Sequence, residues 1–350
     1  MSALLERVQR EGNPLIDGDQ VTFVWEGEAH APQLVGDFTN WGERPITLTH
    51  VERGVWAHTV ALPRDAYVEY SFIYKPDIEE RLVDPHSRHV IWNGVDSVND
   101  TFTMPGFAPS PLTTRQPNVA RGAVSEHQVP AGRWLATPHR RTLLYKPPVD
   151  EPVPLVIVWD GGDYIGRAQL NIIVDNLIAQ KRIRPIALAC IDNGQQARLT
   201  EYFCNDSTIS FLLSQLLPYA HKHLKLVNPA DEPGAYGVLG ASMGGLMALY
   251  TALRIPQLFG HVVSQAGAFF IDDQVETMII DHLVESLPVK PIKIWQDVGT
   301  LDWLLLGNRA MHERLVRKGY DVTYHEYSAG HNYTIWSNYV ERGLEAVYGV

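Results

Sequence analysis

The sequence predicts an all-β sandwich followed by an α/β domain whose mainly parallel sheet carries helices on both faces. Residues up to about 104 read as short strands separated by turns, and from residue 122 apolar strand candidates alternate with amphipathic helix candidates. Strands that are apolar throughout and alternate with helices are typical of a parallel sheet covered on both faces. Between the two patterns lies a segment rich in proline, serine and threonine. We therefore predict a sandwich over residues 1–104, a linker over 105–121 and the α/β domain over 122–350.

The strands of the first half are short and evenly spaced. Residues 68–74, Val-Glu-Tyr-Ser-Phe-Ile-Tyr, alternate with period two, which predicts a half-buried strand. Turn residues at 40–42 and 63–65 stand between strands, and this spacing favours a β-sandwich of immunoglobulin-like size. The predicted strands of this half are 21–25, 33–35, 55–62, 68–74 and 89–92.

The second half contains buried strands and amphipathic helices in alternation. The predicted strands are 123–129, 141–145, 155–159, 186–191, 236–240, 261–265, 292–298 and 322–327, and the predicted helices are 169–180, 207–224, 243–253, 308–318 and 333–348.

The composition indicates which binding partners and which cellular compartment to expect. With 29 Lys and Arg against 40 Asp and Glu, the net charge is −11, which disfavours general binding of nucleic acid or of an anionic membrane. The apolar stretches are strand-sized, far below the 18 or more residues of a membrane span, and the charged N-terminus lacks the apolar region of a signal peptide. Cys190 and Cys204 form no CxxC pair, so we expect reduced thiols, no disulfide and a cytoplasmic protein.

Residues 240–245, Gly-Ala-Ser-Met-Gly-Gly, follow an apolar strand and open a helix. A nucleophile elbow needs this context, since small residues on either side let the chain make a sharp turn that presents the serine. Ser242 is therefore the predicted nucleophile, and the Met243 N–H is predicted to stabilise the oxyanion. The alternative is a glycine-rich turn with an incidental serine.

A serine nucleophile needs a base and an orienting acid, which follow it in the α/β-hydrolase order Ser, acid, His. His331 lies between the last predicted strand and the last predicted helix, where the base is expected. Two aspartates compete for the acid. Asp302 follows the Gly299-Thr300 turn and is preferred because the acid needs a loop position, while Asp297 still belongs to a strand and is kept in reserve.

A second oxyanion donor is expected in the loop over residues 159–164, Trp-Asp-Gly-Gly-Asp-Tyr. Paired glycines allow a close approach to a ligand, so the Gly162 amide is the candidate, with an ordinary turn as the alternative. Asp160 and Asp163 could be taken for a metal pair. Since no His or Glu cluster accompanies them, we expect no metal and no cofactor.

These residues resemble a known family. Residues 122–350 look like the enterochelin esterases and their relatives in the esterase D group of α/β-hydrolases, and the resemblance implies that Ser242, Asp302 and His331 form a catalytic triad. The motifs that carry it are 159–164, Arg198-Leu199-Thr200-Glu201, Leu216-Leu217-Pro218, 240–246, Phe259-Gly260, Ser264-Gln265, 299–302, Gly330-His331-Asn332 and Trp336.

The first half also resembles a sandwich found before these enzymes. Gly36-Asp37-Phe38-Thr39-Asn40-Trp41 and Asp84-Pro85 are similar to the early-set sandwich that precedes enterochelin esterases. A glycogen-binding sandwich of the same kind precedes some feruloyl esterases and glucan enzymes, so these residues identify the fold and not the ligand. The tryptophans at 25, 41, 56 and 92 either stack on ligand rings or belong to the core.

Three residues are candidates for substrate contact. Arg198 and Glu201 follow the fourth strand of the α/β half and either contact substrate or pair with each other at i,i+3 spacing. Ala266 stands where relatives often have a second serine, and Phe269 and Phe270 make that rim of the site apolar. Phe269 is therefore the third candidate.

Taken together, the residues and the resemblance predict a serine carboxylesterase. By resemblance, its substrate is a siderophore trilactone of the enterobactin type, used in iron acquisition. The alternatives are a feruloyl or acetyl esterase acting on acylated carbohydrate and a non-catalytic glucan-binding protein. Because prolines stiffen the linker, we expect the sandwich to shape the mouth of the active site.

Overall fold

The computed structural model describes residues 3–27, 32–74, 81–94, 97–270 and 279–350. The chain divides into two compact units, which are described separately. The sandwich unit comprises Met1–Pro109 together with Gly299–Trp303 and Tyr327–Ile335, and the sheet unit comprises Ser110–Val298, Leu304–Glu326 and Trp336–Val350. Two short segments of the predicted α/β domain therefore pack with the sandwich.

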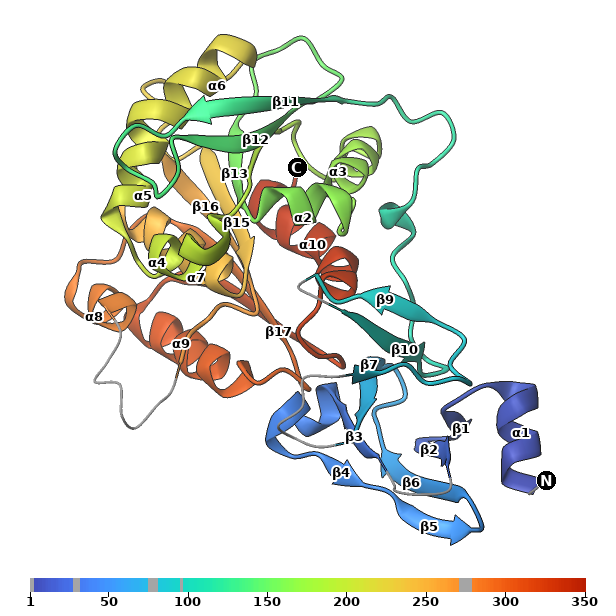
Figure 1. Cartoon of the computed structure of the whole chain (residues 1–350). Helices are drawn as coiled ribbons and strands as arrows, with labels where there is room; N and C mark the ends of the chain where they lie inside the picture. The colour runs from blue at the N-terminus through green and yellow to red at the C-terminus, as the bar shows by residue number, and fades with distance from the viewer. Residues whose placement is uncertain (1–2, 28–31, 75–80, 95–96, 271–278) are drawn as a thin grey trace. The chain divides into compact units, whose positions relative to one another are not determined.

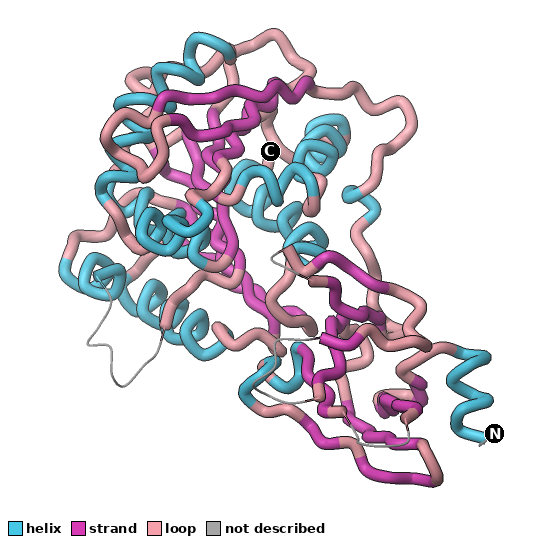
Figure 2. The backbone as a smooth tube through the Cα atoms, in the orientation of Figure 1, coloured by secondary structure: helices cyan, strands magenta, loops and turns pink. Residues whose placement is uncertain are grey.

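The sandwich unit contains two antiparallel sheets, whose strands are magenta in Figure 2. One sheet has the order β1-β2-β6-β5, and the other has the order β4-β3-β7-β10-β9 with β8 paired to β7. The elements are α1 (Ala3–Glu11), β1 (Leu15–Asp17), β2 (Gln20–Glu26), β3 (Gln33–Gly36), η1 (Asp37–Thr39), η2 (Trp41–Glu43), β4 (Ile46–Thr47), β5 (Thr49–Glu52), β6 (Val55–Ala61), β7 (Tyr67–Ile73), β8 (Arg81–Leu82), β9 (Val90–Trp92) and β10 (Val98–Thr103).

Strand β7 differs from the sequence prediction. Its alternating pattern predicted a half-buried strand, yet every residue of Tyr67–Ile73 is buried. Val68, Tyr70 and Phe72 lie in the hydrophobic core of the sandwich, where Tyr70 meets Phe23 edge to face at 4.9 Å. The other face is buried because the segment Tyr327–Ile335 packs with the sandwich: the Tyr67 N–H donates to the Ser328 carbonyl at 3.1 Å.

The sheet unit is built on an eight-stranded sheet of order β11-β12-β14-β13-β15-β16-β17-β18. The pairs β11–β12 and β12–β14 are antiparallel, and the pairs from β14 to β17 are parallel. Figure 1 shows α3 and α10 on one side of this sheet and α7, α8 and α9 on the other. The predicted α/β class with a preceding all-β sandwich is thus confirmed.

The strands of this unit are β11 (Ala123–Pro130), β12 (His139–Lys146), β13 (Leu155–Trp159), β14 (Ala187–Ile191), β15 (Tyr236–Ala241), β16 (Phe259–Gln265), β17 (Lys293–Gly299) and β18 (Asp321–Tyr327). The helices and helical turns are η3 (Pro111–Thr113), α2 (Gly161–Gly166), α3 (Leu170–Ala179), η4 (Gln195–Ala197), α4 (Arg198–Tyr202), α5 (Asp206–Phe211), η5 (Leu212–Leu216), α6 (Leu217–His223), α7 (Met243–Arg254), α8 (Ile279–Ser286), α9 (Leu305–Lys318) and α10 (Tyr333–Tyr348).

The single helix predicted over 207–224 is interrupted. A π-helical turn, η5, separates α5 from α6, and Pro218 is the second residue of α6. Proline has no N–H to donate to the preceding turn, so the regular α-helical hydrogen-bond pattern is broken at this position.

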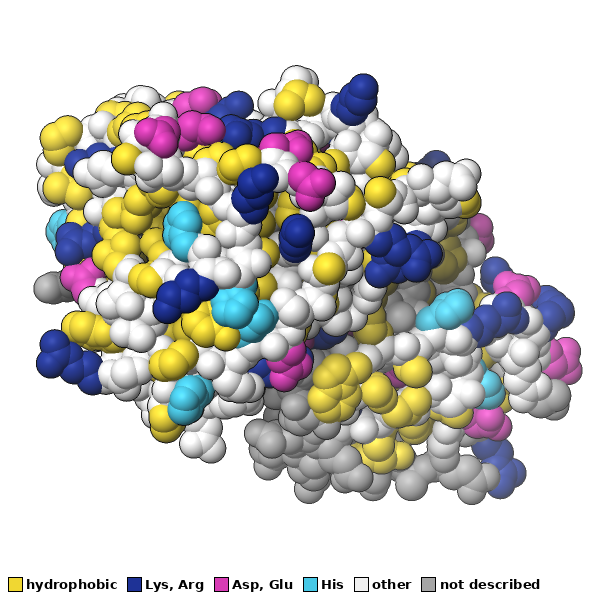
Figure 3. All heavy atoms as spheres, turned by 90° about the horizontal axis from the view of Figure 1, so that it is seen from above, with side chains coloured by type: hydrophobic (Ala, Val, Ile, Leu, Met, Phe, Trp, Pro, Cys, Tyr) yellow, Lys and Arg dark blue, Asp and Glu magenta, His cyan; other side chains and the backbone are white. Residues whose placement is uncertain are grey.

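The surface carries side chains of both charges as well as apolar ones. On the face that Figure 3 shows, basic, acidic and histidine side chains are interspersed with neutral and apolar ones.

Among the described residues, no helix is both long and apolar enough to cross a membrane.

Buried carboxyl groups make the stability of the sandwich depend on pH. Burial raises the pKa of Asp100 from 3.8 to about 6, and its Oδ2 accepts a hydrogen bond from the Asp84 N–H at 2.9 Å. The folded state therefore binds the Asp100 proton more tightly than the unfolded chain does. This contribution to stability is fully present below about pH 4 and is lost as the pH rises through about 6.

We expect Asp100→Asn, which cannot ionise, to gain stability relative to the parent protein between pH 4 and 6. The measurement is the free energy of unfolding in urea at several pH values, with the exposed Asp17→Asn as the control. A difference between Asp100→Asn and parent that stays constant from pH 4 to 8 would contradict the prediction.

Candidate active site

Ser242 occupies a strained turn between β15 and α7. Its backbone has φ 58° and ψ −124°, a conformation that residues other than glycine rarely adopt. Three hydrogen bonds hold it there: the Ser242 N–H donates to the Gln265 carbonyl at 2.9 Å, and the Ser242 carbonyl accepts from Leu246 N–H at 3.1 Å and Ala268 N–H at 2.9 Å. Strained backbone persists where its surroundings fix it in this way. The structure thus has the strand, turn and helix of a nucleophile elbow.

The glycines of the motif are required by close backbone contacts. A Cβ atom at Gly240 would lie 2.5 Å from the Gly244 backbone, and one at Gly245 would lie 2.8 Å from Ser264 Oγ and 3.0 Å from Gly267 Cα. Any larger residue at either position would therefore push the turn away from its place.

The two predicted oxyanion donors both lie in the first turn of a helix. Met243 is the first residue of α7, and Gly162 is the second residue of α2, where the sequence predicted a loop. The first N–H groups of a helix have no acceptor within it, so both amides can donate to another group. Gly161 allows α2 to start close to the sheet, since a Cβ there would lie 2.1 Å from the Cys190 carbonyl carbon.

His331 is paired with Asp302 within the sandwich unit. The His331 Nδ1–H donates to Asp302 Oδ2 at 2.8 Å, with the Asp302 side chain fully buried. The Trp303 ring packs against the imidazole at a centroid distance of 4.2 Å. Asp297, the reserve candidate for the acid, is buried and accepts hydrogen bonds from Trp295 Nε1 at 2.7 Å and Gln265 Nε2 at 3.1 Å. The geometry favours Asp302 as the partner of His331.

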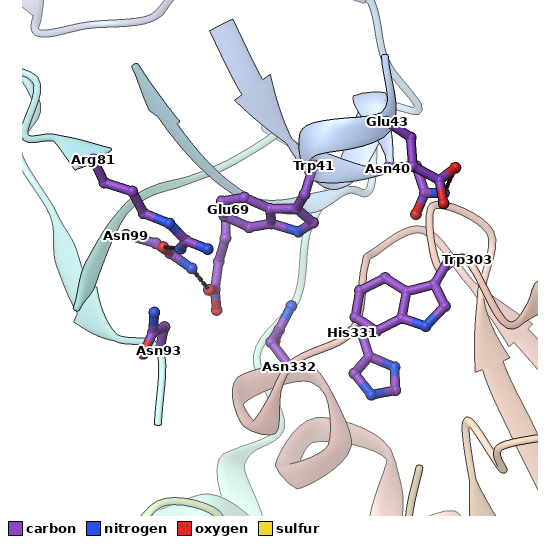
Figure 4. Close-up of a pocket in the computed structure, with 10 residues that line it drawn as sticks. All are labelled: Asn40, Trp41, Glu43, Glu69, Arg81, Asn93, Asn99, Trp303, His331 and Asn332. Carbon is purple, nitrogen blue, oxygen red and sulfur yellow. Dashed lines mark hydrogen bonds between the residues drawn. The ribbon is translucent and has the colours of Figure 1, made fainter. Parts of the chain in front are cut away.

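A pocket of about 470 Å³ opens beside His331, and all of its lining residues belong to the sandwich unit (Figure 4). It combines two indole rings with amides, two carboxylates and one guanidinium. The lining residues are Asn40, Trp41, Glu43, Glu69, Arg81, Asn93, Asn99, Trp303, His331 and Asn332.

One wall of the pocket is held by a chain of side-chain contacts. The Arg81 guanidinium lies over the Trp41 ring, 4.6 Å from its centroid, and also donates to Asn99 Oδ1. Asn99 Nδ2 in turn donates to Glu69 Oε2 at 2.7 Å (Figure 4). These contacts fix the orientation of the polar groups that face the pocket.

Arg198 and Glu201 have structural partners other than each other. Arg198 donates to both oxygens of Asp160, at 2.8 and 2.7 Å, and the Asp160 side chain is 2% exposed. Glu201 accepts from Arg140 Nη2 at 2.8 Å in a buried ion pair. The alternative of an i,i+3 pair is therefore wrong, because each residue has an oppositely charged neighbour from another part of the fold.

The remaining predicted residues are placed as follows. Phe269 is 3% exposed and lies in the hydrophobic core, whereas Phe270 is 47% exposed. Asp160 is the partner of Arg198, and among the residues that the structure describes no group of three His, Cys, Asp or Glu side chains could hold a metal ion.

The structure brings Asp302 and His331 together in the sandwich unit, while Ser242, Met243 and Gly162 lie in the sheet unit. Of the residues that line the pocket, Asn40, Trp41, His331 and Asn332 lie in motifs that the sequence showed, whereas the other six were not predicted. Asn40 and Trp41 belong to the motif that marked the sandwich, and both have a positive φ, of 52° and 54°. Polar residues such as Arg81 and Asn99 carry no comparable signal.

The fold and the elbow define the class of protein, an α/β-hydrolase preceded by an all-β sandwich. Residues 137–345 match the family described as Putative esterase. Since this match spans more than half of the chain, the protein belongs to that esterase family and is a carboxylic ester hydrolase. Residues 9–87 match Carbohydrate-binding module 48, the isoamylase N-terminal domain.

Individual relatives identify an enterochelin esterase-like protein within this family. An iron(III) salmochelin esterase from Escherichia coli O6:H1 is 25% identical over 366 residues, covering 95% of this chain and 88% of that protein. An iron(III) enterobactin esterase from Dickeya dadantii is 32% identical over 215 residues, covering 56% of this chain and 49% of its own length. The crystal structure of the enterobactin esterase from Shigella flexneri, in the presence of 2,3-dihydroxy-N-benzoyl-serine, has the same fold. It aligns with a TM-score of 0.76 and 19% identity over 98% of this chain and 97% of that chain.

The elbow glycines yield a testable prediction. We expect Gly240→Ala to lower the free energy of unfolding by about 1–3 kcal/mol through overpacking and to lower kcat for p-nitrophenyl acetate by at least about tenfold through displacement of Ser242. Urea unfolding and steady-state kinetics measure the two effects.

The matched control is Gly166→Ala, because a Cβ at Gly166 has nothing within 4 Å. Equal activity and stability of both variants would mean that the close contact at Gly240 does not constrain the elbow.

Proposed function

We propose that the protein is a serine esterase in which Ser242, His331 and Asp302 form a catalytic triad. The observation that carries the proposal is the 2.8 Å hydrogen bond from His331 Nδ1–H to the buried Asp302, beside a pocket that has room for a substrate. The strained backbone of Ser242 supports its role as nucleophile.

In the proposed mechanism, Ser242 Oγ attacks the ester carbonyl carbon while His331 Nε2 takes the hydroxyl proton. Asp302 keeps the proton on Nδ1 and stabilises the imidazolium that forms. The amides of Met243 and Gly162 donate to the oxyanion. His331 then protonates the leaving alkoxide, an acyl-enzyme remains, and water releases it in a second cycle with the same groups.

For the substrate we propose a siderophore trilactone of the enterobactin type, cleaved during iron acquisition. The named relatives act on salmochelin and enterobactin, and the Shigella flexneri structure was determined with a dihydroxybenzoyl amide present. The pocket suits such a ligand, because indole rings can stack on a catechol ring while Arg81 and the amides can bind its oxygens.

A feruloyl or acetyl ester of a carbohydrate is the second candidate. The observation that favours it is the match of residues 9–87 to a carbohydrate-binding module. Binding of glycogen or maltoheptaose by the full chain, together with faster hydrolysis of feruloyl sugars than of enterobactin, would favour this candidate over the trilactone.

We further propose that the protein acts in the cytoplasm. Cys190 and Cys204 are both buried and free, which suits a reducing compartment.

The triad leads to a first kinetic prediction. Ser242→Ala and His331→Ala should each lower kcat on the order of 10⁶-fold, and Asp302→Asn about 10⁴-fold, because it leaves the imidazole without its orienting acceptor. The measurement is steady-state hydrolysis of p-nitrophenyl acetate, combined with mass spectrometry of Ser242 after treatment with an organophosphonate. The control is Asp297→Asn. A greater loss in this variant than in Asp302→Asn, or a missing adduct on Ser242, would contradict the triad.

The pocket leads to a second kinetic prediction. Arg81→Leu should lower kcat/KM for enterobactin by about tenfold or more, which corresponds to about 1.4 kcal/mol. The same variant should leave hydrolysis of p-nitrophenyl acetate within about twofold, because an acetyl ester is too small to need Arg81. The exposed Arg44→Leu removes the same charge outside the pocket lining. Equal losses in the two arginine variants would show that net charge, and not the pocket, controls the rate.

A further inference from the structure

The segment that carries His331 is held by the sandwich at both of its ends. Before the histidine, the Tyr67 N–H donates to the Ser328 carbonyl at 3.1 Å. After it, the Tyr67 hydroxyl donates to Thr334 Oγ1 at 3.3 Å. One residue of β7 therefore contacts the chain on either side of His331.

Between these two contacts, Gly330 packs directly on the carboxyl group of Asp37. A Cβ atom at Gly330 would lie 2.1 Å from both Cγ and Oδ1 of Asp37 and 2.7 Å from its Cβ. The φ angle of Gly330 is not positive, so its backbone conformation is open to other residues. A side chain at this position would be disfavoured because it would collide with Asp37. Asp37 thus touches the residue that immediately precedes His331.

The Asp37 side chain is itself rigidly held. It is 4% exposed, its Oδ2 accepts from the Glu69 N–H at 2.9 Å, and its Oδ1 accepts from Trp41 Nε1–H at 3.2 Å. A carboxyl group fixed on both oxygens offers a stiff surface to the chain that packs against it, because it cannot rotate without breaking a buried hydrogen bond.

The segments of His331 and Asp302 are also joined to each other. The Thr300 N–H donates to the Tyr327 carbonyl at 2.7 Å, and the Leu301 N–H donates to the Ala329 carbonyl at 3.0 Å. Leu301 in addition packs on the hydrophobic core of the sandwich. A displacement of Gly330 would therefore move the acid and the base together, away from their working position.

We propose that Asp37 is a positioning residue for the esterase reaction, which holds the His331–Asp302 pair in place through its contact with Gly330. The proposal rests on the proposed triad and assigns to the sandwich a part in the chemical step, in addition to any part in binding. Asp37 touches neither the nucleophile nor the ester in this scheme and acts only through the chain at 327–335.

The surroundings of Asp37 shift its pKa upward. Burial, the negative charge of Glu69 and, to a smaller extent, that of Asp302 raise the pKa of Asp37 well above its ordinary value. A raised pKa favours the neutral form of the Asp37 carboxyl group, which limits the negative charge that lies next to Asp302.

The test uses the full chain and a double-mutant cycle between the two contacting residues. Gly330→Ala should lower kcat for p-nitrophenyl acetate by about 100-fold, with KM within about twofold, because a displacement of about 1 Å at a catalytic group has an effect of this size. Asp37→Gly should lower kcat by about tenfold through loss of the stiff contact. In the double variant the new Cβ occupies the space that the carboxyl group leaves, so Gly330→Ala should cost less than about threefold in the Asp37→Gly background.

The control for a merely structural effect is Asp84→Ala. Asp84 is another buried carboxyl group of the sandwich, hydrogen-bonded to Tyr70, Asn13 and the His86 N–H, and outside the chain around His331. This variant should lose stability on heating yet keep kcat within about twofold at a temperature where it is folded. If Asp37→Gly does not fold, Asp37→Ala replaces it in the cycle. Asp37→Ala removes Cγ and Oδ1 but leaves Cβ, which would still lie 2.7 Å from the new Cβ, so in this background the loss of kcat caused by Gly330→Ala should become smaller without disappearing.

The outcomes separate this proposal from the proposed function. A 100-fold loss for Gly330→Ala in both backgrounds, unchanged kcat in Asp37→Gly, or an effect on KM alone would overturn the positioning role while the triad stands. Activity that survives Ser242→Ala or His331→Ala would instead overturn the triad on which the role depends.

Discussion

Two backbone hydrogen bonds, from Thr300 to Tyr327 and from Leu301 to Ala329, join the segment that carries Asp302 to the segment that carries His331. The side-chain hydrogen bond between His331 and Asp302 depends on these two bonds, because they set the distance between two segments that are about 30 residues apart in the chain. A short and well-aligned contact between His and Asp contributes to catalysis only if it persists through the reaction. In the proposed triad, these two backbone hydrogen bonds and the Tyr67 N–H of β7, which donates to the Ser328 carbonyl, would hold the pair in place.

Strand β7 has a polar face that is buried beneath residues 327–335. Glu69 and Asp37 are buried beside each other, which is costly for two carboxyl groups unless their oxygens are hydrogen-bonded. The Asp37 oxygens have the Glu69 N–H and the Trp41 indole as donors, and Glu69 Oε2 has Asn99. Residues 327–335 cover this face and exclude water from it. The hydrogen-bond network therefore provides donors for the buried carboxyl oxygens of Asp37 and Glu69.

Local patterns in the sequence were sufficient for the fold and for part of the site. The elbow could be predicted because strand, serine, glycines and helix are contiguous, and Asp302 could be preferred to Asp297 because the geometry of a strand end is local. The partners of Arg198 and Glu201 could not be predicted, because Asp160 and Arg140 lie 38 and 61 residues away and meet them only in the folded chain. The full burial of β7 was missed for the same reason.

The pocket residues were missed because polar side chains in short strands and turns look alike whether they face solvent or a ligand. Helix α8 was not predicted either, although its eight residues are amphipathic. The interruption by η5 follows from Pro218 only once the helix around it is known. The triad candidates, by contrast, were placed by the order of strands and loops, which the sheet topology preserves.

The burial of both faces of β7 has a consequence for how such proteins evolve. A sandwich with one solvated face can be exchanged between enzymes as a self-contained module, since nothing on its surface depends on the neighbour. Here β7 has a hydrophobic face for the sandwich and a polar face matched to residues 328–334. Substitutions in β7 and in residues 328–334 should therefore occur together during evolution. A recombination event that gave this hydrolase a different sandwich would also have to replace the chain around His331.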